Sequence, residues 1–286
     1  STRAMAATGT DTASRAPKSP GETCPGHAPQ AAQSSRAAAL QAQIESIVRS
    51  APSGRWGVYV HHLSSGDTVS VDGDVVFHPA STIKIAIALD LLAWLEQHPD
   101  IRMVNGPPGA DRSFGNLLRA MLINSEEEAT VVLRDFLNGQ PGHRIDAQLH
   151  DWGIECSSVV PRRATPAELA FLLERLYRRE LLSRASTDLL LSVMRTPSPD
   201  DAERLGGGLP ESARARLAHK TGTLFQDGLG VVADVGLVVT SKGAYTIAVL
   251  SNGVEWADQD AALRLISDLS RAAYAVYGPP ASSKWR

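Results

Sequence analysis

The sequence has few lysines, few cysteines and no long hydrophobic run. Only five of its 28 lysine and arginine residues are lysines, at positions 18, 84, 220, 242 and 284, so a lysine within a motif is informative. No apolar stretch reaches the roughly 20 residues that cross a bilayer, so we expect no membrane-spanning segment. The formal charge of −3 provides no basic field for binding a nucleic acid. The remaining composition, 43% hydrophobic and 21% charged, is typical of a globular protein.

The chain has only two cysteines, Cys24 and Cys156. Two cysteines can form a disulfide in an oxidising compartment. Because Cys24 lies in a polar N-terminal stretch and Cys156 in an expected loop, we favour two unrelated thiols and keep the disulfide as the alternative. Neither CxxC nor HExxH spacing occurs, so we expect no metal site and no cofactor.

The first 36 residues are rich in Ser, Thr, Pro, Gly, Ala and Gln, with almost no large apolar side chains. Such a segment cannot bury enough surface to offset the entropy that it loses on ordering. We therefore expect residues 1–36 to be a disordered leader or a cloning remnant, residues 37–280 to form one domain, and residues 281–286 to be a tail. The charged-then-apolar pattern of a signal peptide is not visible in this chain.

The hydrophobic pattern predicts, in order, a helix, a β-hairpin, several helices, three strands and a last helix. We expect a helix at 37–49 and a hairpin of two strands around a Gly-containing turn at 64–67. Thr165 and Pro166 form a typical helix start, and Glu168 completes the pattern of a capping box. Short connections between the late strands favour antiparallel pairing, so the predicted fold class is α/β (α+β), an antiparallel β-sheet flanked by helices plus an all-helical lobe. The expected helices are 82–97, 113–139, 143–151, 166–179, 183–194 and 256–277, and the late strands are 216–223, 230–239 and 244–251.

Ser81 and Lys84 are the first candidates for chemistry. They are three residues apart at the head of an apolar run, so a helix there places both side chains on one face of its first turn. A hydroxyl beside an amine can become an activated nucleophile. Taken singly, Ser81 can equally be a helix N-cap and Lys84 a solvated first-turn residue.

Two further motifs follow in the chain, Ser125 at the start of a Ser-Glu-Glu triplet and Lys220-Thr221-Gly222 on an expected strand. A Ser-x-x-Lys motif, a serine triplet and Lys-Thr-Gly, in this order, resemble the class A serine β-lactamases and their penicillin-binding relatives. The resemblance covers roughly residues 40–277. It implies a β-lactamase/transpeptidase-like fold and a serine acyl hydrolase that forms an acyl-enzyme on Ser81. It also implies a small-molecule β-lactam, peptide or ester substrate, a location outside the cytoplasm and a monomer.

The same resemblance assigns roles to individual residues. Ser81 would be the nucleophile, Lys84 its base, and Ser125 the relay of a proton to the leaving nitrogen. Lys220 would add positive charge that favours an anionic substrate group. The backbone N–H groups of Ser81 and Thr223 would form an oxyanion hole. The expected substrate-binding residues are Thr221, Gly222, Thr223 and Glu127.

The chain departs from the family at Glu127, where an asparagine is expected. An ionised carboxylate cannot donate a hydrogen bond, so Glu127 should attract a substrate donor or pair with Lys84. Pairing would raise the pKa of Lys84 and weaken it as a base.

Two other family features are not obvious in the sequence. The loop before Thr165 lacks the family's glutamate and asparagine pair, and Glu155 is its nearest candidate for the deacylating base. The segment 217–262 has no arginine for recognising a substrate carboxylate, which leaves Arg214, Arg216 and Lys242 as candidates.

These departures keep two alternatives open. One is a peptidase, esterase or transacylase of the same fold, with slow or no turnover of β-lactams. The other is a catalytically inactive binding module that retains the cleft.

Overall fold

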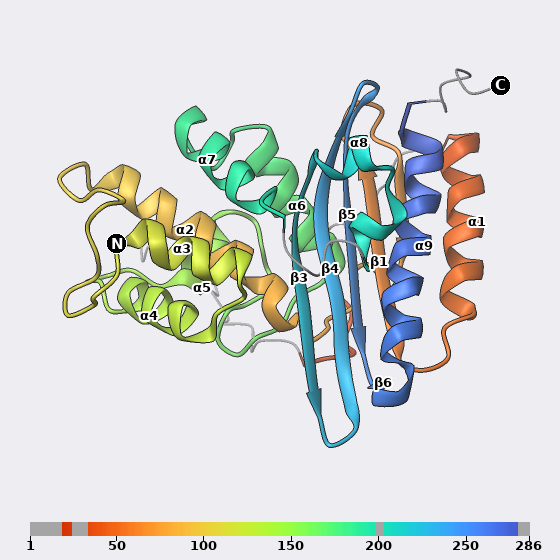
Figure 1. The fold of residues 1–286 in the computed structure, drawn as a ribbon, viewed down its shortest axis with the longest axis horizontal. Helices are drawn as coiled ribbons and strands as arrows, with labels where there is room; N and C mark the ends of the chain where they lie inside the picture. Colours follow the sequence, from red (N-terminus) through yellow and green to blue (C-terminus); the bar gives the residue numbers. More distant parts are fainter. Residues whose placement is uncertain (1–18, 25–33, 198–202, 280–286) are drawn as a thin grey trace, which may run out of the picture.

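The protein is built around one antiparallel sheet, with helices on both of its faces (Figure 1). The computed structural model describes residues 19–24, 34–197 and 203–279. The strands have the order β2-β1-β5-β4-β3, and the short β6 pairs with the start of β4. This arrangement confirms the predicted antiparallel sheet. The strand bounds are β1 Arg55–His62, β2 Thr68–Val71, β3 Leu217–Gln226, β4 Leu229–Thr240, β5 Gly243–Asn252 and β6 Val254–Glu255.

Helices α1 (Ser35–Arg49) and α9 (Gln259–Tyr277) cover one face of the sheet side by side, as Figure 1 shows at its right edge. Their apolar sides form a core with Val58, Val60 and Ile247 of the sheet. The two helices come from opposite ends of the domain, so this layer exists only when the ends of the chain meet.

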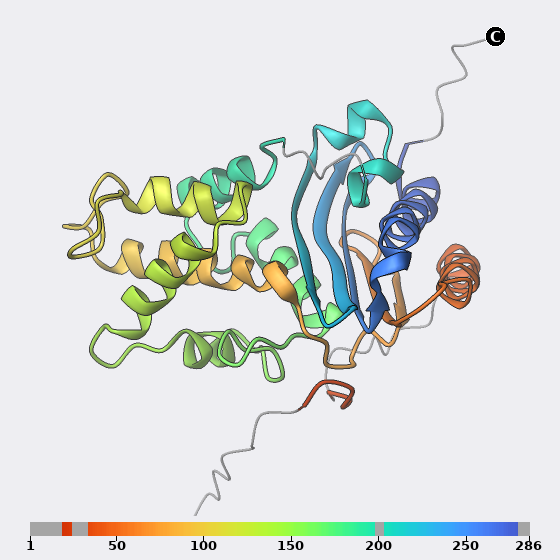
Figure 2. The same cartoon turned by 60° about the horizontal axis from the view of Figure 1, so that its bottom comes forward.

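The other face of the sheet carries α6 and, beyond it, a helical lobe that projects away from the sheet (Figure 2). Helix α2 is buried at every residue from Lys84 to Leu95, which is typical of a helix at the centre of a lobe. The predicted all-helical lobe is therefore present. The bounds on this side are η1 Ala80–Ile83, α2 Lys84–Gln97, α3 Phe114–Ile123, α4 Glu127–Asn138, α5 Ile145–Asp151, α6 Pro166–Tyr177 and α7 Arg184–Met194.

Short elements complete the described chain. They are η3 Leu205–Gly208, α8 Glu211–Arg214 and η4 Trp256–Asp258. Gly208 allows η3 to pack closely on α9, because a Cβ there would lie 2.2 Å from the carbonyl oxygen of Ser267. Within the described residues, no helix is both long and apolar enough to cross a membrane.

The prediction of a single helix at 113–139 is wrong, because the helical backbone is interrupted between α3 and α4. Ser125 has φ +55°, a left-handed conformation that interrupts a helical hydrogen-bond ladder. Glu126 precedes α4 as its N-cap residue, and Glu127 and Glu128 fill the first turn, where carboxylates suit the helix dipole. The apolar spacing continues across the break, so periodicity alone did not reveal it.

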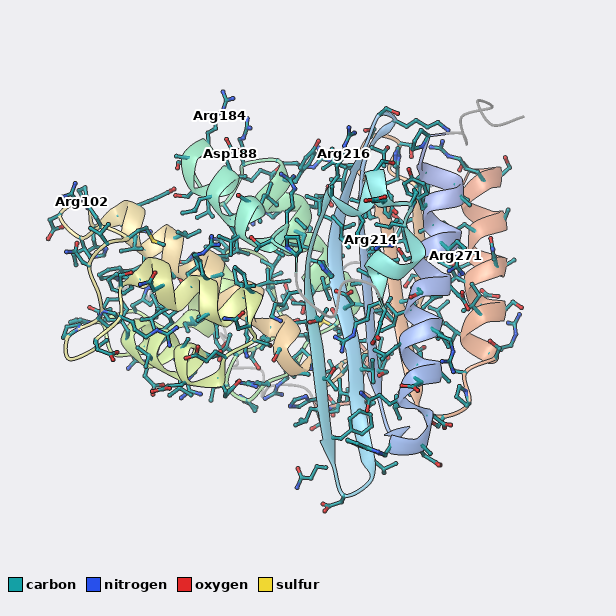
Figure 3. All side chains as sticks on the ribbon, in the orientation of Figure 1. Arg102, Arg184, Asp188, Arg214, Arg216 and Arg271 are labelled. Carbon is teal, nitrogen blue, oxygen red and sulfur yellow. A yellow bond between two sulfur atoms is a disulfide. The ribbon has the colours of Figure 1, made fainter. Side chains whose placement is uncertain are left out.

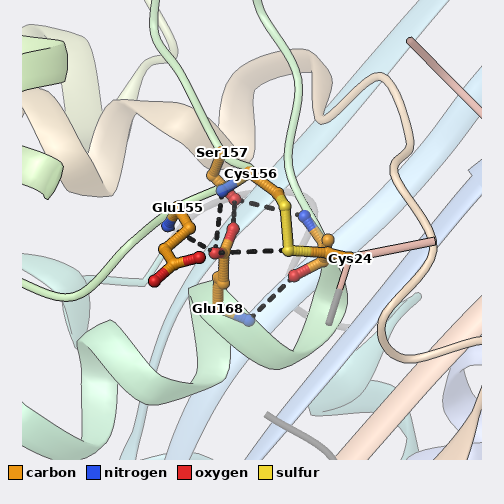
Figure 4. Close-up of a disulfide and its surroundings, with 6 residues drawn as sticks. Cys24, Glu155, Cys156, Ser157 and Glu168 are labelled. Atoms are coloured by element: carbon orange, nitrogen blue, oxygen red, sulfur yellow. Dashed lines mark hydrogen bonds between the residues drawn. A yellow bond between two sulfur atoms is a disulfide. The ribbon is translucent and has the colours of Figure 1, made fainter. Parts of the chain in front are cut away.

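The expectation of a disordered leader is wrong for residues 19–24, and the preference for two unrelated thiols is wrong as well. Gly21 N donates to Val76 O at 2.8 Å, and Cys24 N donates to Asp74 O at 2.7 Å. Cys24 and Cys156 form a disulfide across 132 residues of sequence (Figure 4). Backbone pairing and a covalent bond hold this segment. The rest of residues 1–33 and residues 280–286 lie outside the described residues.

Helix α6 starts as predicted, but its capping box is incomplete. Thr165 Oγ1 accepts a hydrogen bond from Glu168 N at 3.1 Å. The fully buried Glu168 carboxylate turns instead to the preceding loop, where it accepts from Glu155 N at 2.7 Å and from Cys156 N at 2.9 Å (Figure 4). The Ser157 hydroxyl donates to the same carboxylate at 2.5 Å. Glu168 therefore anchors the loop rather than the helix end.

Candidate active site

A cavity of about 420 Å³ lies where η1, the start of α4, the loop before α6 and strand β3 meet. The sequence motifs that are far apart in the chain converge on it. Its lining residues are Ala80, Ser81, Ser125, Glu127, Arg162, Arg204, Thr221, Gly222, Thr223 and Leu224.

Ser81 lies in η1, partly exposed to the cavity. Pro79 is the N-cap residue of η1 and Ile83 that of α2, and neither end has a side-chain cap. The Ser81 hydroxyl is therefore not a helix cap. Ala80 next to it has φ +47°, a conformation that non-glycine residues adopt mainly at functional sites and turns.

Lys84 is completely buried directly after η1, which excludes a solvated first-turn residue. Its Nζ donates to the Ser125 carbonyl oxygen at 2.8 Å and lies 3.5 Å from Ser125 Oγ. Glu127 Oε2 is 3.1 Å from the same nitrogen, so the predicted pairing of Lys84 with Glu127 is present.

The predicted effect of this pairing is confirmed, since Glu127 raises the pKa of Lys84, but the net shift of that pKa is downward. Burial lowers the pKa of Lys84 because a charged amine is poorly solvated there, and this effect outweighs the hydrogen bond and charge of Glu127, which raise the pKa. The positive charge of Arg162 lowers it further. Lys84 therefore loses its proton more easily than an ordinary lysine.

Glu127 joins the two sides of the cavity. It forms one ion pair with Lys84 and a second with Arg162 from the loop before α6. Burial alone would raise the pKa of Glu127, but the hydrogen bonds from Arg162 and Lys84 lower it overall. Glu127 is consequently an ionised acceptor, as its residue type suggested.

Strand β3 forms the wall opposite Ser125. A Cβ at Gly222 would lie 3.0 Å from the backbone nitrogen of Ser81 and 3.0 Å from Pro79 O, so only a glycine permits this approach. Lys220 is 3% exposed, and its Nζ donates to Thr221 O at 3.0 Å. Lys220 lies behind the main cavity, and Thr221 lines both this cavity and a small space beside Lys220.

Arg204 is a cavity residue that the sequence reasoning missed. Arg204 is 5% exposed as a whole, and its guanidinium donates to Thr223 Oγ1 at 2.6 Å and to Ala233 O at 3.4 Å, both neutral acceptors. Among the described residues, no carboxylate pairs with it, and its Nε has no hydrogen-bond partner. Burying a cation against neutral acceptors is energetically costly, so Arg204 is a candidate for contact with a ligand anion.

The three cations that the sequence offered for carboxylate recognition lie outside the cavity lining. Arg214 is the last residue of α8 and Arg216 follows it, on the side of the sheet that α9 covers (Figure 3). Arg214 donates to Gly206 O at 3.0 Å, and neither arginine lines the cavity; nor does the exposed Lys242. The glycine run 206–208 was the available signal in the sequence, because small residues allow η3 to pack closely on α9. That packing places the neighbouring Arg204 beside β3.

The loop before α6 contributes Arg162 and not the expected Glu155. Glu155 is exposed and does not line the cavity, so the structure does not support it as a base there. The disulfide and Glu168 hold this loop (Figure 4), and Asp146 accepts from Val159 N at 2.6 Å. Arg162 therefore projects from a well-anchored segment.

The fold and the site together define a serine hydrolase of the β-lactamase type. The chain belongs to the beta-lactamase enzyme family, whose model matches residues 39–277. It is similar to beta-lactamase VEB-1 of Pseudomonas aeruginosa, with 24% identity over 83% of this chain and 90% of that protein.

Solved structures have the same fold. The TLA-1 extended-spectrum beta-lactamase has a TM-score of 0.72 at 20% identity and covers 84% of this chain and 98% of its own. PBP-A has a TM-score of 0.71 at 26% identity over 84% of this chain and 96% of its own. A variant of PBP-A was solved as an acyl-enzyme complex with penicillin G. The family implies small-molecule substrates for this chain.

Proposed function

We propose that this protein cleaves β-lactams or related cyclic amides by forming an acyl-enzyme on Ser81. The observation that carries the proposal is the buried amine of Lys84, which contacts Ser125 within the cavity that Ser81 lines. A serine hydroxyl needs a base that removes its proton, and a buried lysine with a lowered pKa supplies one.

The other residues support the same reaction. Ser125 passes the proton from Lys84 to the nitrogen that leaves the substrate. The backbone N–H groups of Ser81 and Thr223 stabilise the oxyanion, a contribution of about 3 kcal/mol per donor in other enzymes. The close approach of Gly222 to Ser81 supports this placement. Lys220 adds positive charge behind Thr221.

We propose Arg204 as the residue that binds the carboxylate of the substrate. Its guanidinium lines the cavity, and it lacks an anionic partner among the described residues. Thr223 Oγ1 fixes its position at 2.6 Å. A carboxylate beside Arg204 would lie at the end of the site that β3 borders.

A peptidase or transacylase with a long-lived acyl-enzyme is the second candidate. It is favoured by the absence of Glu155 from the cavity lining, and by the similarity to PBP-A. A catalytically inactive binding module is disfavoured, because a buried lysine is costly and binding alone does not require it. We place the protein outside the cytoplasm, since its disulfide suits an oxidising compartment.

The test is a reaction with a chromogenic cephalosporin, followed by absorbance and by intact mass. Sustained colour release supports hydrolysis, and a single burst with a stable adduct on Ser81 supports the second candidate. Ser81→Ala must abolish both signals. The absence of colour and of an adduct, with activated esters also left intact, would exclude both enzymatic functions for these substrates.

A further inference from the structure

The cavity contains one carboxylate that has no counterpart in the expected motif. Of the described residues that line it, Glu127 alone is acidic. Glu155 lies outside the cavity, and Glu168 is fully buried and accepts three hydrogen bonds from the loop. Among the described residues, Glu127 is therefore the carboxylate that can act as a base in this cavity.

Glu127 is both anchored and accessible to water. Lys84 Nζ lies 3.1 Å from its Oε2, and Arg162 binds its Oε1. The side chain of Glu127 is nevertheless 53% exposed, whereas Lys84 beside it has no exposure. A carboxylate held in this way can accept a hydrogen bond from a water molecule without losing its orientation.

We propose that Glu127 is a catalytic residue that orients and deprotonates the water that releases the acyl group from Ser81. This inference rests on the proposed function, since it concerns the second half of that reaction. It explains two departures of the chain together: a carboxylate stands where the family has an asparagine, and the loop before α6 brings no carboxylate into the cavity.

The chemical step is balanced without a further reactant. Glu127 takes a proton from water, and the hydroxide oxygen forms a bond to the acyl carbon. The bond from that carbon to Ser81 Oγ then breaks. The proton returns from Glu127 to Ser81 Oγ through Lys84, whose Nζ contacts Glu127. The products are a carboxylic acid and the free Ser81 hydroxyl, with Glu127 ionised and Lys84 neutral again.

Arg162 positions Glu127 for this step. It comes from a loop that the disulfide and Glu168 hold to the body of the protein (Figure 4). Together with Lys84, Arg162 lowers the pKa of Glu127, which keeps the carboxylate ionised as a proton acceptor. The contacts with Arg162 and with the Lys84 amine also fix the orientation of the Glu127 carboxylate.

The decisive experiment measures acylation and deacylation separately in the wild type, Glu127→Gln and Glu128→Gln, by stopped-flow absorbance and time-resolved intact mass with a chromogenic cephalosporin. Glu128 is exposed in the same helical turn and does not line the cavity, so its variant is the matched control. We expect Glu127→Gln to form the adduct on Ser81 but to release it at least about 100-fold more slowly, the usual scale of general-base catalysis. Glu128→Gln should keep both wild-type rates.

Other outcomes separate this inference from the proposed function. If the wild type forms no adduct, the proposed function fails. If the wild type forms an adduct that is never released, or Glu127→Gln releases it within about threefold of the wild-type rate, the inference fails and acylation on Ser81 stands. A defect of Glu127→Gln that is confined to acylation also overturns the inference, because it would reflect only the contact with Lys84. Adduct formation by the variant itself shows that it is folded.

Discussion

Lys84 shows how burial and charge compete at a single residue. Glu127 raises its pKa and burial lowers it, and the net direction is downward because no part of the side chain reaches water. The motif in the sequence revealed the partners of the amine. It did not reveal the depth of burial, which depends on how α2 packs within the helical lobe. The ionisation of this residue should control the rate of acylation.

We therefore predict that the acylation rate rises with pH, with a midpoint below the pKa of an ordinary lysine, because only neutral Lys84 accepts the Ser81 proton. Arg162→Gln should move the midpoint to higher pH, since the Arg162 charge lowers the pKa of Lys84. Glu127→Gln should move it to lower pH for the opposite reason. Pre-steady-state rates across pH measure both shifts. Arg184→Gln, on the exposed side of α7 (Figure 3), is the control. Unmoved midpoints in both variants would argue against Lys84 as the base.

Arg204→Gln tests the carboxylate site. A hydrogen bond to a charged group contributes about 1.5–3 kcal/mol, so kcat/KM for a substrate with a carboxylate should fall by about 10- to 100-fold. The methyl ester of the same substrate should show little change, because it presents no anion. Steady-state kinetics with the two substrates check this difference. An equal loss for both substrates would contradict anion binding at Arg204 and indicate a general disturbance of β3.

At the scale of elements, the site depends on the contact between β3 and η1. The two elements form walls of the same cavity, and they approach each other closely only because Gly222 has no side chain. The sequence predicted the strand and the helix start, since each follows a local pattern. The break at Ser125 was not predicted, because its left-handed φ leaves no mark on hydrophobic periodicity.

Gly222→Ala should reduce the acylation rate strongly and the thermal stability only slightly. Its Cβ would lie 3.0 Å from the nitrogen of Ser81 and 3.1 Å from the Cβ of Ala80, so β3 and η1 must separate. A shift of about 1 Å can reduce a rate about 100-fold, and we expect the acylation rate to fall by at least about tenfold. Stopped-flow acylation together with thermal unfolding separates the two effects. A variant with the wild-type rate would show that this contact does not position Ser81.

At the scale of the whole molecule, the disulfide joins the N-terminal segment to the loop that carries Arg162. It spans 132 residues of sequence, and closing so long a loop restricts the unfolded chain strongly. Residues 19–24 cannot form a core of their own, so their position depends on this bond and on backbone pairing with residues 74–76.

Replacing both cysteines, Cys24→Ala with Cys156→Ala, should lower the free energy of unfolding by about 3–5 kcal/mol. Guanidinium unfolding with and without a reductant measures this. The reductant should destabilise the wild type by a similar amount and leave the double variant unchanged. A wild type that is insensitive to reductant after complete reduction, verified by thiol titration, would contradict the stabilising role.

Stability should also fall in mild acid because of His62. Burial, followed by the charge of Arg36, lowers the pKa of His62 in the folded protein, and its ring stacks on Tyr277 at 4.8 Å. Neutral His62 therefore stabilises the fold above the unfolded pKa of about 6.5, and this contribution is lost as the pH falls toward the lower folded pKa. Between pH 7 and pH 5, a range of about two pH units that includes the unfolded pKa, the free energy of unfolding should fall less in His62→Gln than in the wild type. Urea unfolding at several pH values measures this difference. An equal dependence of the free energy of unfolding on pH in both proteins would contradict the role of His62.

Sequence patterns were enough to predict the order of most strands and helices, the antiparallel sheet with a helical lobe, and the three motifs that meet at the cavity. These features depend on local periodicity and on residue types at fixed short spacings. The folded structure was needed to show that Cys24 is bonded to Cys156 and that Arg204 and Arg162 line the cavity while Glu155 does not. It was also needed to show that burial outweighs Glu127 in its effect on the pKa of Lys84. Each of these depends on the approach of segments that are distant in the chain, and on how much water their packing excludes.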